Sequence, residues 1–463
     1  METCKRRFGQ LKVGIIGAGA AGLAAGYQLA EQGISVELFE RDKTLGGLAG
    51  SFLLDNGYVE KFYHFICLSD FTYLDTLKEL KLDHRLRWRL TDMGQYYNGR
   101  LYSFGRPQDL FLFPHLGFTD KIRFAREIMK IKSGEWKDWK AMEGVPVNDW
   151  LQQTFGPEVF RILHEPLIRL KFGKYAEKLS ASWMWARIHR LGKSRTRIRQ
   201  REKVGYVEGG SQIIMDALGD SIRKRGGKIH LGVQVQGLIL DESGVCGLRV
   251  DGEEPRFDAI LSTVPLPALL RILPAQLSGE YWTHLRNIES IGVICAFLRI
   301  KKSLTKYFWT NINDPRIELA GIIEYTNLNP LPHLKGDSII YLPQYIASTD
   351  EKFSRKDDQI LAEYIGYLGF INPDFQRSDI REAFVFRERY AQPICEVGFT
   401  KDIPEIKTPL PRFYLTDSSQ LHPDDRTISN SIGLGKSAAE RILKQQSEMI
   451  KSKSVGAGLS PAV

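Results

Sequence analysis

The N-terminal part of the chain alternates short apolar runs with one longer helical pattern. Residues 12–16 form a mostly apolar run that leads into glycine, which predicts a buried parallel strand. Residues 23–32 are rich in Ala and Leu and predict a helix that ends at Gly33. Residues 35–40 predict a second strand. The order strand, helix, strand is typical of a doubly wound α/β domain.

The turn between the first strand and the helix is rich in glycine. Gly17 allows a tight turn, Gly19 lets the backbone approach a pyrophosphate, and Gly22 lets the helix pack closely on the sheet. The amino end of the helix supplies free N–H groups and a positive dipole. Glu40 ends the second strand, close to the position where an acid that binds ribose hydroxyls is expected. We therefore predict a dinucleotide site here, made by Gly17, Gly19, Ala20, Ala21, Gly22 and Glu40.

The segment after Glu40 bears on which dinucleotide is bound. Gly46 and Gly47 permit a second backbone approach to the cofactor, whereas Arg41 keeps NADP as the lesser alternative because it could meet a 2′-phosphate. The segment resembles the ERxxxxGG extension of flavoproteins in the amine oxidase, protoporphyrinogen oxidase and phytoene desaturase superfamily. This resemblance implies FAD as the cofactor, contacted here by Arg41, Gly46, Gly47 and Leu48.

Two middle segments resemble the same superfamily. Residues 205–210 precede a helical stretch and then two predicted strands, at 226–231 and 233–240. The resemblance implies that the backbone of Val235 pairs with the adenine edge, with an ordinary strand as the alternative. Residues 258–265 look like the strand that returns beneath the cofactor, which implies a contact from Thr263.

A segment near the carboxyl end is similar to the closing FAD motif of the superfamily. Residues 413–417 predict a strand that ends at Asp417, and residues 430–442 predict a helix. The resemblance implies that Asp417 approaches the phosphate and ribityl region, and that the helix points its amino end at the flavin pyrimidine. Thr416 replaces a frequent glycine, which leaves the contact of Asp417 open. The helix residues expected at the site are Asn430, Ser431 and Ile432.

These patterns predict an α/β fold class, with a discontinuous Rossmann-type FAD-binding domain and a mixed α+β substrate domain. The first part of the substrate domain is expected to be mostly helical and the second part mostly strands. The tail is polar and rich in small residues, which predicts disorder. The predicted divisions are 1–75, 205–275 and 405–445 for the FAD-binding domain, 76–204 and 276–404 for the substrate domain, and 446–463 for the tail.

Composition narrows the function classes. In the 463 residues, 43% are hydrophobic and 26% are charged, which excludes wholesale disorder and a polytopic membrane protein. The net charge of +9 is modest for this length, so no nucleic-acid partner is expected. The five cysteines and nine histidines lack disulfide-framework or metal-ligand spacing, so free thiols in a reducing cytosol and no metal are expected.

The extreme N-terminus superficially resembles a signal peptide. Residues 5–7 are basic and precede the largely apolar stretch 11–30. That stretch contains the glycine motif, whose removal would delete the cofactor site. The sequence therefore predicts a cytoplasmic protein that keeps these residues.

The superfamily resemblance also points to two candidate catalytic residues. Residues 60–64 fall where the family chain passes near the isoalloxazine, and residues 390–393 resemble a proline-containing stretch that reaches the flavin face. His64 and Tyr390 are the candidates, with packing or surface roles as the alternative.

Two further stretches bear on the substrate and partners. Residues 110–118 are aromatic and apolar and precede the basic stretch 121–140; relatives that handle lipophilic substrates dock on membranes here, although a buried tunnel or simple packing is the alternative. Residues 187–203 contain eight Lys or Arg against one acid. A solvated face, attraction to anionic lipids, or a phosphorylated substrate would each explain that excess.

The predicted function is that of an FAD-dependent oxidoreductase, in which flavin N5 accepts a hydride from a C–N or C–C centre of an organic small-molecule substrate. A lipophilic or phosphate-bearing substrate fits the stretches above. The first alternative is a flavoenzyme without net redox turnover, similar to UDP-galactopyranose mutase, acting on a nucleotide sugar. A non-catalytic scaffold that retains FAD is the second. The sequence leaves the electron acceptor and the oligomeric state open.

Overall fold

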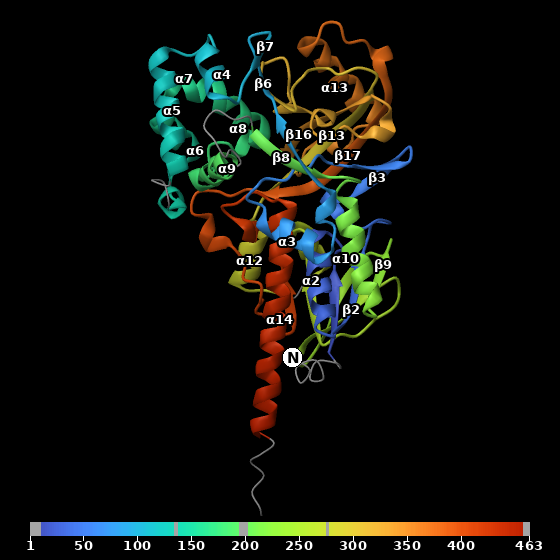
Figure 1. Ribbon diagram of the computed structural model, residues 1–463. Helices are drawn as coiled ribbons and strands as arrows, with labels where there is room; N and C mark the ends of the chain where they lie inside the picture. The colour runs from blue at the N-terminus through green and yellow to red at the C-terminus, as the bar shows by residue number, and fades with distance from the viewer. Residues whose placement is uncertain (1–10, 134–137, 194–201, 275–276, 457–463) are drawn as a thin grey trace, which may run out of the picture.

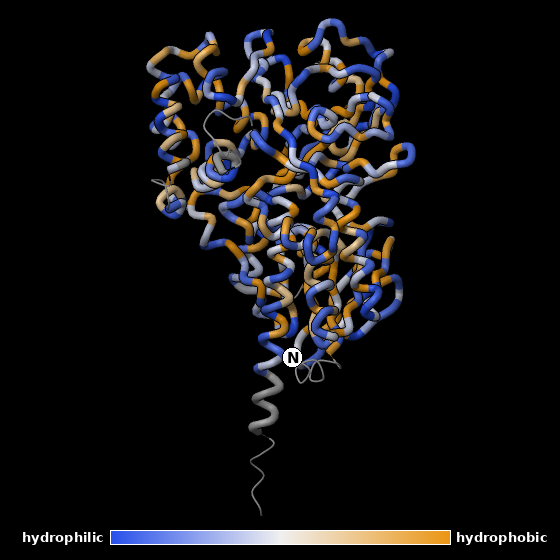
Figure 2. Tube along the Cα trace, in the orientation of Figure 1, coloured by the Kyte–Doolittle hydropathy of each residue, from blue (hydrophilic) through white to orange (hydrophobic). Residues whose placement is uncertain are grey.

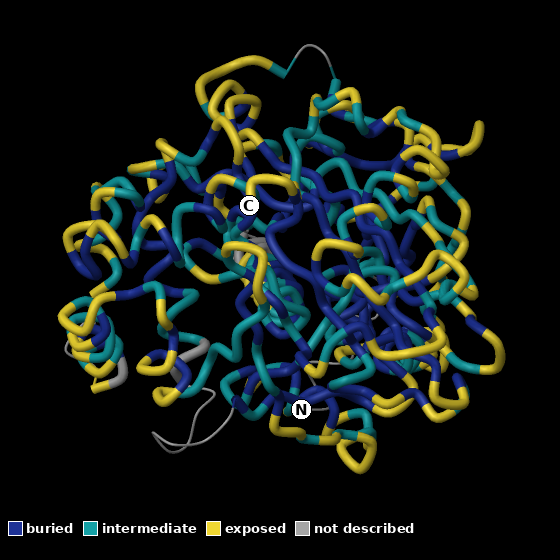
Figure 3. Tube along the Cα trace, turned by 90° about the horizontal axis from the view of Figure 1, so that it is seen from above, coloured by how far each residue is buried: buried dark blue, intermediate teal, exposed yellow. Residues whose placement is uncertain are grey.

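The computed structural model describes residues 11–133, 138–193, 202–274 and 277–456. Two sheets form the centres of two lobes, and one long C-terminal helix extends from the lower lobe (Figure 1). Hydrophobic residues recur along the strands and inner helix faces of both lobes (Figure 2). Seen from above, buried residues occupy the interior and exposed loops the rim (Figure 3).

A five-stranded parallel sheet organises the lower lobe. Its strand order is β18-β12-β1-β2-β9, and each neighbouring pair is parallel. The strands are apolar on both faces because the sheet is covered on both faces. Their bounds are β1 Lys12–Ile16, β2 Ser35–Glu40, β9 Lys228–Leu231, β12 Ala259–Ser262 and β18 Phe413–Leu415.

Three helices cover one face of this sheet: α2 (Ala20–Glu31), α10 (Gln212–Lys224) and α14 (Ile428–Gly456). Small residues on α2 set the close packing. A Cβ at Gly26 would lie 3.0 Å from Ile222 Cδ1, and a Cβ at Gly435 of α14 would lie 2.1 Å from the carbonyl oxygen of Ala21. The antiparallel ribbon β10–β11 and the helices α11 and α12 supply the apolar core on the other face. Their bounds are β10 Val235–Asp241, β11 Gly244–Val250, α11 Leu266–Ile272 and α12 Glu280–Asn287.

A seven-stranded mixed sheet organises the upper lobe, in the order β17-β13-β16-β15-β14-β6-β7. Helix α13 packs on this sheet against β13 and β17, and α4 to α9 form a helical group at the side whose α8 packs against β14 and β16 (Figure 1). The strand bounds are β6 Met93–Tyr97, β7 Arg100–Ser103, β13 Ser290–Ile300, β14 Trp309–Asn313, β15 Gly321–Glu324, β16 Ser338–Ala347 and β17 Ile380–Pro393. The helix bounds are α4 Pro107–Leu112, α5 Phe118–Ser133, α6 Val147–Phe155, α7 Pro157–Val159, α8 Glu165–Phe172, α9 Ala181–Lys193 and α13 Asp357–Ile371.

Short elements connect the two lobes. Strand β8 follows the helical group and pairs antiparallel with β5, and helix α3 packs beside α14. A one-turn π-helix at Phe160–His164 joins α7 to α8. The remaining bounds are β3 Ser51–Leu54, β4 Gly57–Glu60, α3 Phe71–Glu79, β5 Leu86–Thr91 and β8 Glu202–Val207.

The predicted fold class is confirmed: a parallel Rossmann-type sheet is combined with a mixed α+β lobe. The expectation that residues 76–204 are mostly helical is confirmed, since α4 to α9 lie within them, although β5, β6 and β7 do so as well. One local expectation is wrong. The tail is not disordered from residue 446, because α14 continues to Gly456; its Gln, Glu, Met and Lys residues are good helix formers and no proline interrupts them. Residues 457–463 lie outside the described residues.

Candidate cofactor and substrate sites

A cleft of about 560 Å³ lies along the carboxyl ends of the parallel strands. The residues that line it at the strand ends are Ile16 at the end of β1, Gly17 after β1, Glu40 at the end of β2, Thr263 after β12 and Asp417 after β18. This edge of a doubly wound sheet is where such folds bind ligands, because the strand ends and helix amino ends converge there.

The glycine turn is shaped to leave room in this cleft. Gly17 has φ +97°, and its N–H donates to the carbonyl oxygen of Phe39 at 2.8 Å. A Cβ at Gly22 would lie 2.1 Å from the Gly17 carbonyl oxygen, so Gly22 is required for the turn itself. A Cβ at Gly19, in contrast, would meet nothing closer than Gly46 O at 3.9 Å. Gly19 therefore keeps the cleft open for a ligand, which fits the diphosphate of FAD.

Glu40 holds the same turn from the opposite side. Its carboxylate accepts a hydrogen bond from Ala18 N at 2.7 Å and another from Asp42 N at 2.9 Å. Gly46, next to the turn, donates to Ala18 O and has φ +112°, a conformation that favours glycine. The acid and the glycine pair predicted from the sequence are thus joined directly to the glycine turn.

Most of the predicted cofactor residues lie together. Those that line the cleft are Gly17, Gly19, Ala20, Ala21, Glu40, Arg41, Gly46, Gly47, Leu48, Val235, Thr263, Asp417 and Ser431. Three others do not line it. Gly22 packs under the turn, Ile432 is fully buried in the core between helices, and the Asn430 side chain donates to Asp425 O at 2.9 Å.

Asp417 and Thr263 brace the floor of the cleft. The Asp417 carboxylate accepts hydrogen bonds from Ser419 N at 2.7 Å and Leu266 N at 3.0 Å, and burial raises the pKa of Asp417. Thr263 Oγ1 donates to Ile16 O at 2.9 Å. Val235 is buried at the start of β10. These contacts within the protein hold the floor of the cleft in place.

Replacing Glu40 with Ala should weaken FAD binding about tenfold to a hundredfold, because a charged acceptor of two buried backbone N–H groups is lost. Titration of apoprotein with FAD, followed by flavin fluorescence, measures the affinity. Glu37→Gln is the matched control, since Glu37 is buried on the same strand but does not line the cleft. Equal affinity of the two variants would contradict the assignment of Glu40.

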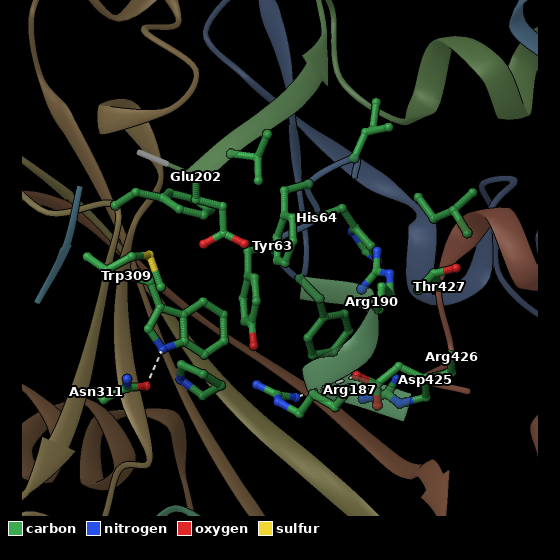
Figure 4. A pocket seen from close by; sticks show the side chains of 18 of the residues that line it. Tyr63, His64, Arg187, Arg190, Glu202, Trp309, Asn311, Asp425, Arg426 and Thr427 are labelled. Atoms are coloured by element: carbon green, nitrogen blue, oxygen red, sulfur yellow. Dashed lines mark hydrogen bonds and ion pairs between the residues drawn. The ribbon is translucent and has the colours of Figure 1, made fainter. Parts of the chain in front are cut away.

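A second, internal cavity of about 360 Å³ adjoins the cleft. Aromatic side chains from both lobes make up much of its wall, including Tyr63, Phe308 and Trp309. Figure 4 shows Tyr63 between Trp309 and Asn311 on one side and a group of charged side chains on the other. Six residues line both spaces: Leu48, Phe62, His64, Arg426, Thr427 and Ile428.

His64 stands at this junction, as one of the two residues predicted to act in catalysis. Its Nδ1 is buried without a hydrogen-bond partner in the described part of the chain. Burial, reinforced by the nearby Arg426, lowers the pKa of His64 to about 4. The ring is therefore neutral near pH 7 and presents an unused polar atom beside the junction.

Tyr390 has a different position. It lines the cleft but is not among the residues that line the internal cavity. Its hydroxyl is hydrogen-bonded to Arg271 of α11, and its backbone N–H donates to Glu388 at 3.1 Å. Glu388 in turn meets Arg41 across the cleft at 3.4 Å. Among the described residues, Tyr390 thus belongs to the wall of the cleft and not to that of the internal cavity.

The basic stretch 187–203, for which a phosphorylated substrate was one interpretation, supplies two arginines to the cavity wall. Three other charged residues of that wall, Lys171, Asp425 and Arg426, were not predicted from the sequence. Arg190 forms an ion pair with Asp70 at 3.1 Å, and Arg187 meets Asp425 at 3.5 Å. The spacing of Arg187 and Arg190 within one amphipathic helix, α9, was the available signal. Much of the Arg-rich stretch that drew attention in the sequence, residues 194–201, lies outside the described residues.

In the described part of the chain, no helix combines the length and apolar character needed to cross a membrane.

The family model for flavin containing amine oxidoreductase matches residues 20–443. Among curated proteins, the chain is 22% identical to 15-cis-phytoene desaturase of Glycine max, over 96% of this chain and 81% of that protein. It is 21% identical to 15-cis-phytoene desaturase of Synechococcus elongatus, over 95% of this chain and 97% of that protein.

Solved structures of low sequence identity share the fold. A putative protoporphyrinogen oxidase from Exiguobacterium sp. superposes with a TM-score of 0.73 at 16% identity, covering 94% of this chain and 99% of that one. Reduced UDP-galactopyranose mutase gives a TM-score of 0.71 at 18% identity, with 94% and 96% covered.

Proposed function

The chain belongs to the flavin containing amine oxidoreductase family, and we propose that this FAD-dependent oxidoreductase oxidises a C–N or C–C centre of a largely apolar organic molecule held in the internal cavity. The observation that carries the proposal is the shared lining of the cleft and the cavity. A molecule in the cavity has direct access to whatever occupies the cleft at His64 and Thr427.

Bound FAD supplies the electron chemistry by accepting a hydride. The residues predicted to hold it are those of the cleft: the Gly17–Gly22 turn for the diphosphate, Glu40 for a ribose, and Val235 for the adenine edge. The chain itself excludes water from the reacting carbon through the aromatic wall, and it orients the substrate against the junction. In this proposal His64 positions the substrate with its neutral ring, and Tyr390 contacts the cofactor.

The same proposal divides the chain as the sequence suggests. Residues 1–75, 205–275 and 405–445 would bind FAD, and residues 76–204 and 276–404 would bind the substrate. Support comes from the strand order of the parallel sheet, whose five strands derive from the first set alone.

Anaerobic mixing of the holoenzyme with candidate substrates tests the activity. We expect the visible absorbance of the oxidised flavin to bleach with at least one amine, polyprenoid or porphyrinogen. Bleaching by dithionite but by no member of a broad apolar panel would contradict the proposal.

A second candidate is an isomerase of nucleotide sugars, similar in fold to UDP-galactopyranose mutase. The cationic side chains on one wall of the cavity favour it, because a diphosphate requires such partners. The two candidates differ in electron balance. Turnover of a nucleotide sugar only after dithionite reduction, without consumption of any acceptor, would select the isomerase; stoichiometric flavin reduction by substrate would select the oxidoreductase.

We also propose that α4 and α5 contact a lipid surface. Leu112 and Phe118 are 78% and 72% exposed, and Ile122 and Met129 continue the exposed apolar row along α5. The basic Arg126 lies in the same row, as an interfacial helix requires. Another face of α5 places Phe124 in the wall of the cavity, so this helix would link the membrane to the substrate space.

The double substitution Leu112→Ser and Phe118→Ser should lower vesicle binding about tenfold or more, because two large apolar groups no longer enter the interface. Co-sedimentation with vesicles of phosphatidylcholine and phosphatidylglycerol measures the bound fraction. Leu53→Ser, at another exposed leucine on strand β3, is the control and should bind like the native protein. Undiminished binding of the double variant would refute the contact.

A further inference from the structure

In one part of the wall of the internal cavity, cationic side chains outnumber acidic ones. Lys171 of α8, Arg187 of α9 and Arg426 before α14 line the cavity there. Asp425 is the acid among them, and it already accepts a hydrogen bond from Trp183 Nε1 at 3.1 Å. Arg190, the next cation along α9, is paired with its own acid, Asp70. Figure 4 shows Arg187, Asp425 and Arg426 close together at the side of the pocket opposite Trp309.

Lys171 is buried without an oxygen partner. The residue is 7% exposed, and its ammonium lies 5.2, 4.8 and 5.2 Å from the ring centroids of Phe172, Trp183 and Tyr345. In the described part of the chain its Nζ makes no hydrogen bond or ion pair. The rings attract the cation, but they leave its three N–H donors without strong acceptors. A buried ammonium in that state is costly unless an anion joins it.

The two arginines also have unused donors. Arg187 forms an ion pair with Asp425 at 3.5 Å but no side-chain hydrogen bond within the described residues, although a guanidinium has five N–H donors. Arg426 Nε is buried without a partner in the described chain. Because Arg426 lines both the cleft and the cavity, its free donor lies beside the junction where the two spaces meet.

The apolar part of the cavity wall indicates the polarity of the rest of the ligand. Phe65, Leu163, Leu167, Phe308 and Trp309 present apolar surface to the same cavity. A ligand that matches both the cationic side chains and this apolar surface therefore combines an apolar body with one anionic group. Burial, together with the two neighbouring arginines, lowers the pKa of Lys171 to about 7, and Asp425 opposes this effect. A bound anion would favour the protonated ammonium.

We propose that Lys171, Arg187 and Arg426 bind the anionic group, a carboxylate or a phosphate, of an amphipathic substrate whose apolar part lies along the aromatic wall. This inference rests on the proposed function, because it names the substrate class of the same cavity. It assigns a role to Lys171 and Arg426, which lie outside the Arg-rich stretch of the sequence.

The test uses the FAD-loaded protein and calorimetric titration with three probes of equal chain length: octanoate, octyl phosphate and 1-octanol. We expect at least one anion to bind about tenfold or more tightly than the neutral alcohol, since charged hydrogen bonds add to the shared apolar contact. The stronger of the two anions identifies the group as carboxylate or phosphate. Equal affinity for all three probes would overturn the proposal.

Lys171→Met should remove most of the preference for the anion and leave 1-octanol affinity unchanged. The matched control is Lys174→Met, because Lys174 is exposed three residues away and lies over Tyr175 at 4.9 Å rather than in the cavity. If both variants keep the preference, the proposal is wrong. If Lys171→Met does not fold, Arg187→Gln provides the same comparison.

Binding in this test requires no turnover, so its failure is separable from failure of the proposed function. A holoenzyme that is reduced by an apolar substrate but shows no preference for anions refutes the anion site alone. A holoenzyme that prefers the anions but is reduced by no substrate refutes the oxidoreductase proposal and retains the site.

Discussion

Gly19→Val should yield a folded protein without bound flavin, with FAD affinity lowered about a hundredfold or more. The backbone at Gly19 has φ −73° and ψ −178°, an extended conformation that any residue adopts. A Cβ there would meet no atom of the protein closer than 3.9 Å, so valine would not disturb the packing. Its methyl groups would instead occupy the cleft where the diphosphate is expected, and a loss of about 2.7 kcal/mol corresponds to a hundredfold.

Absorbance of the purified protein, followed by titration with FAD, measures this effect, and circular dichroism checks the fold. Gly366→Val is the control, since Gly366 lies exposed on α13 and a Cβ there would meet nothing within 4 Å. Full flavin occupancy in Gly19→Val would show that the phosphates lie elsewhere.

Asp70→Ala should lower the free energy of unfolding by about 3–5 kcal/mol, because it leaves Arg190 as an uncompensated charge in the interior. Asp70 accepts hydrogen bonds from Arg190 Nη2 at 3.1 and 3.2 Å and from Cys67 N at 2.8 Å. The side chains of Arg190 and Asp70 are only 16% and 8% exposed. Urea unfolding at a fixed FAD concentration measures the change.

The control is Glu208→Ala. Glu208 pairs with Arg87 at 2.8 Å, but both side chains are nearly half exposed, so this loss should cost about 1 kcal/mol or less. A double variant, Asp70→Ala with Arg190→Met, should recover part of the lost stability because no unpaired charge remains. If Asp70→Ala and Glu208→Ala proved equally mild, the ion pair would not be the cause.

The cofactor cleft was accessible from the sequence because its signals are local. The strands at 12–16 and 35–40 have the predicted bounds, and the glycines that shape the turn lie within six consecutive residues. The helix between them begins at Ala20 rather than Leu23, because Gly19 already adopts the N-cap position. Short-range sterics and apolar periodicity determine such features.

The cavity was not accessible in the same way. Lys171 lies in a helix, Trp309 in a strand and Asp425 in a loop, and only the tertiary fold brings them to one wall. Lys171 sits among apolar residues whose periodicity predicts no more than an ordinary helix end. A local sequence pattern does not reveal that a charged side chain is buried, because its neighbours in the fold are distant in sequence.

The strand order of the lower sheet has a consequence for how the protein acquires its cofactor during synthesis. Strand β18 is translated about 150 residues after β12, yet it pairs with β12 and precedes Asp417 of the cleft, and α14 packs on α2. A nascent chain that has left the ribosome only as far as β17 therefore has an unfinished cradle. A cradle that includes Asp417 therefore forms only after the residues through β18 have been translated.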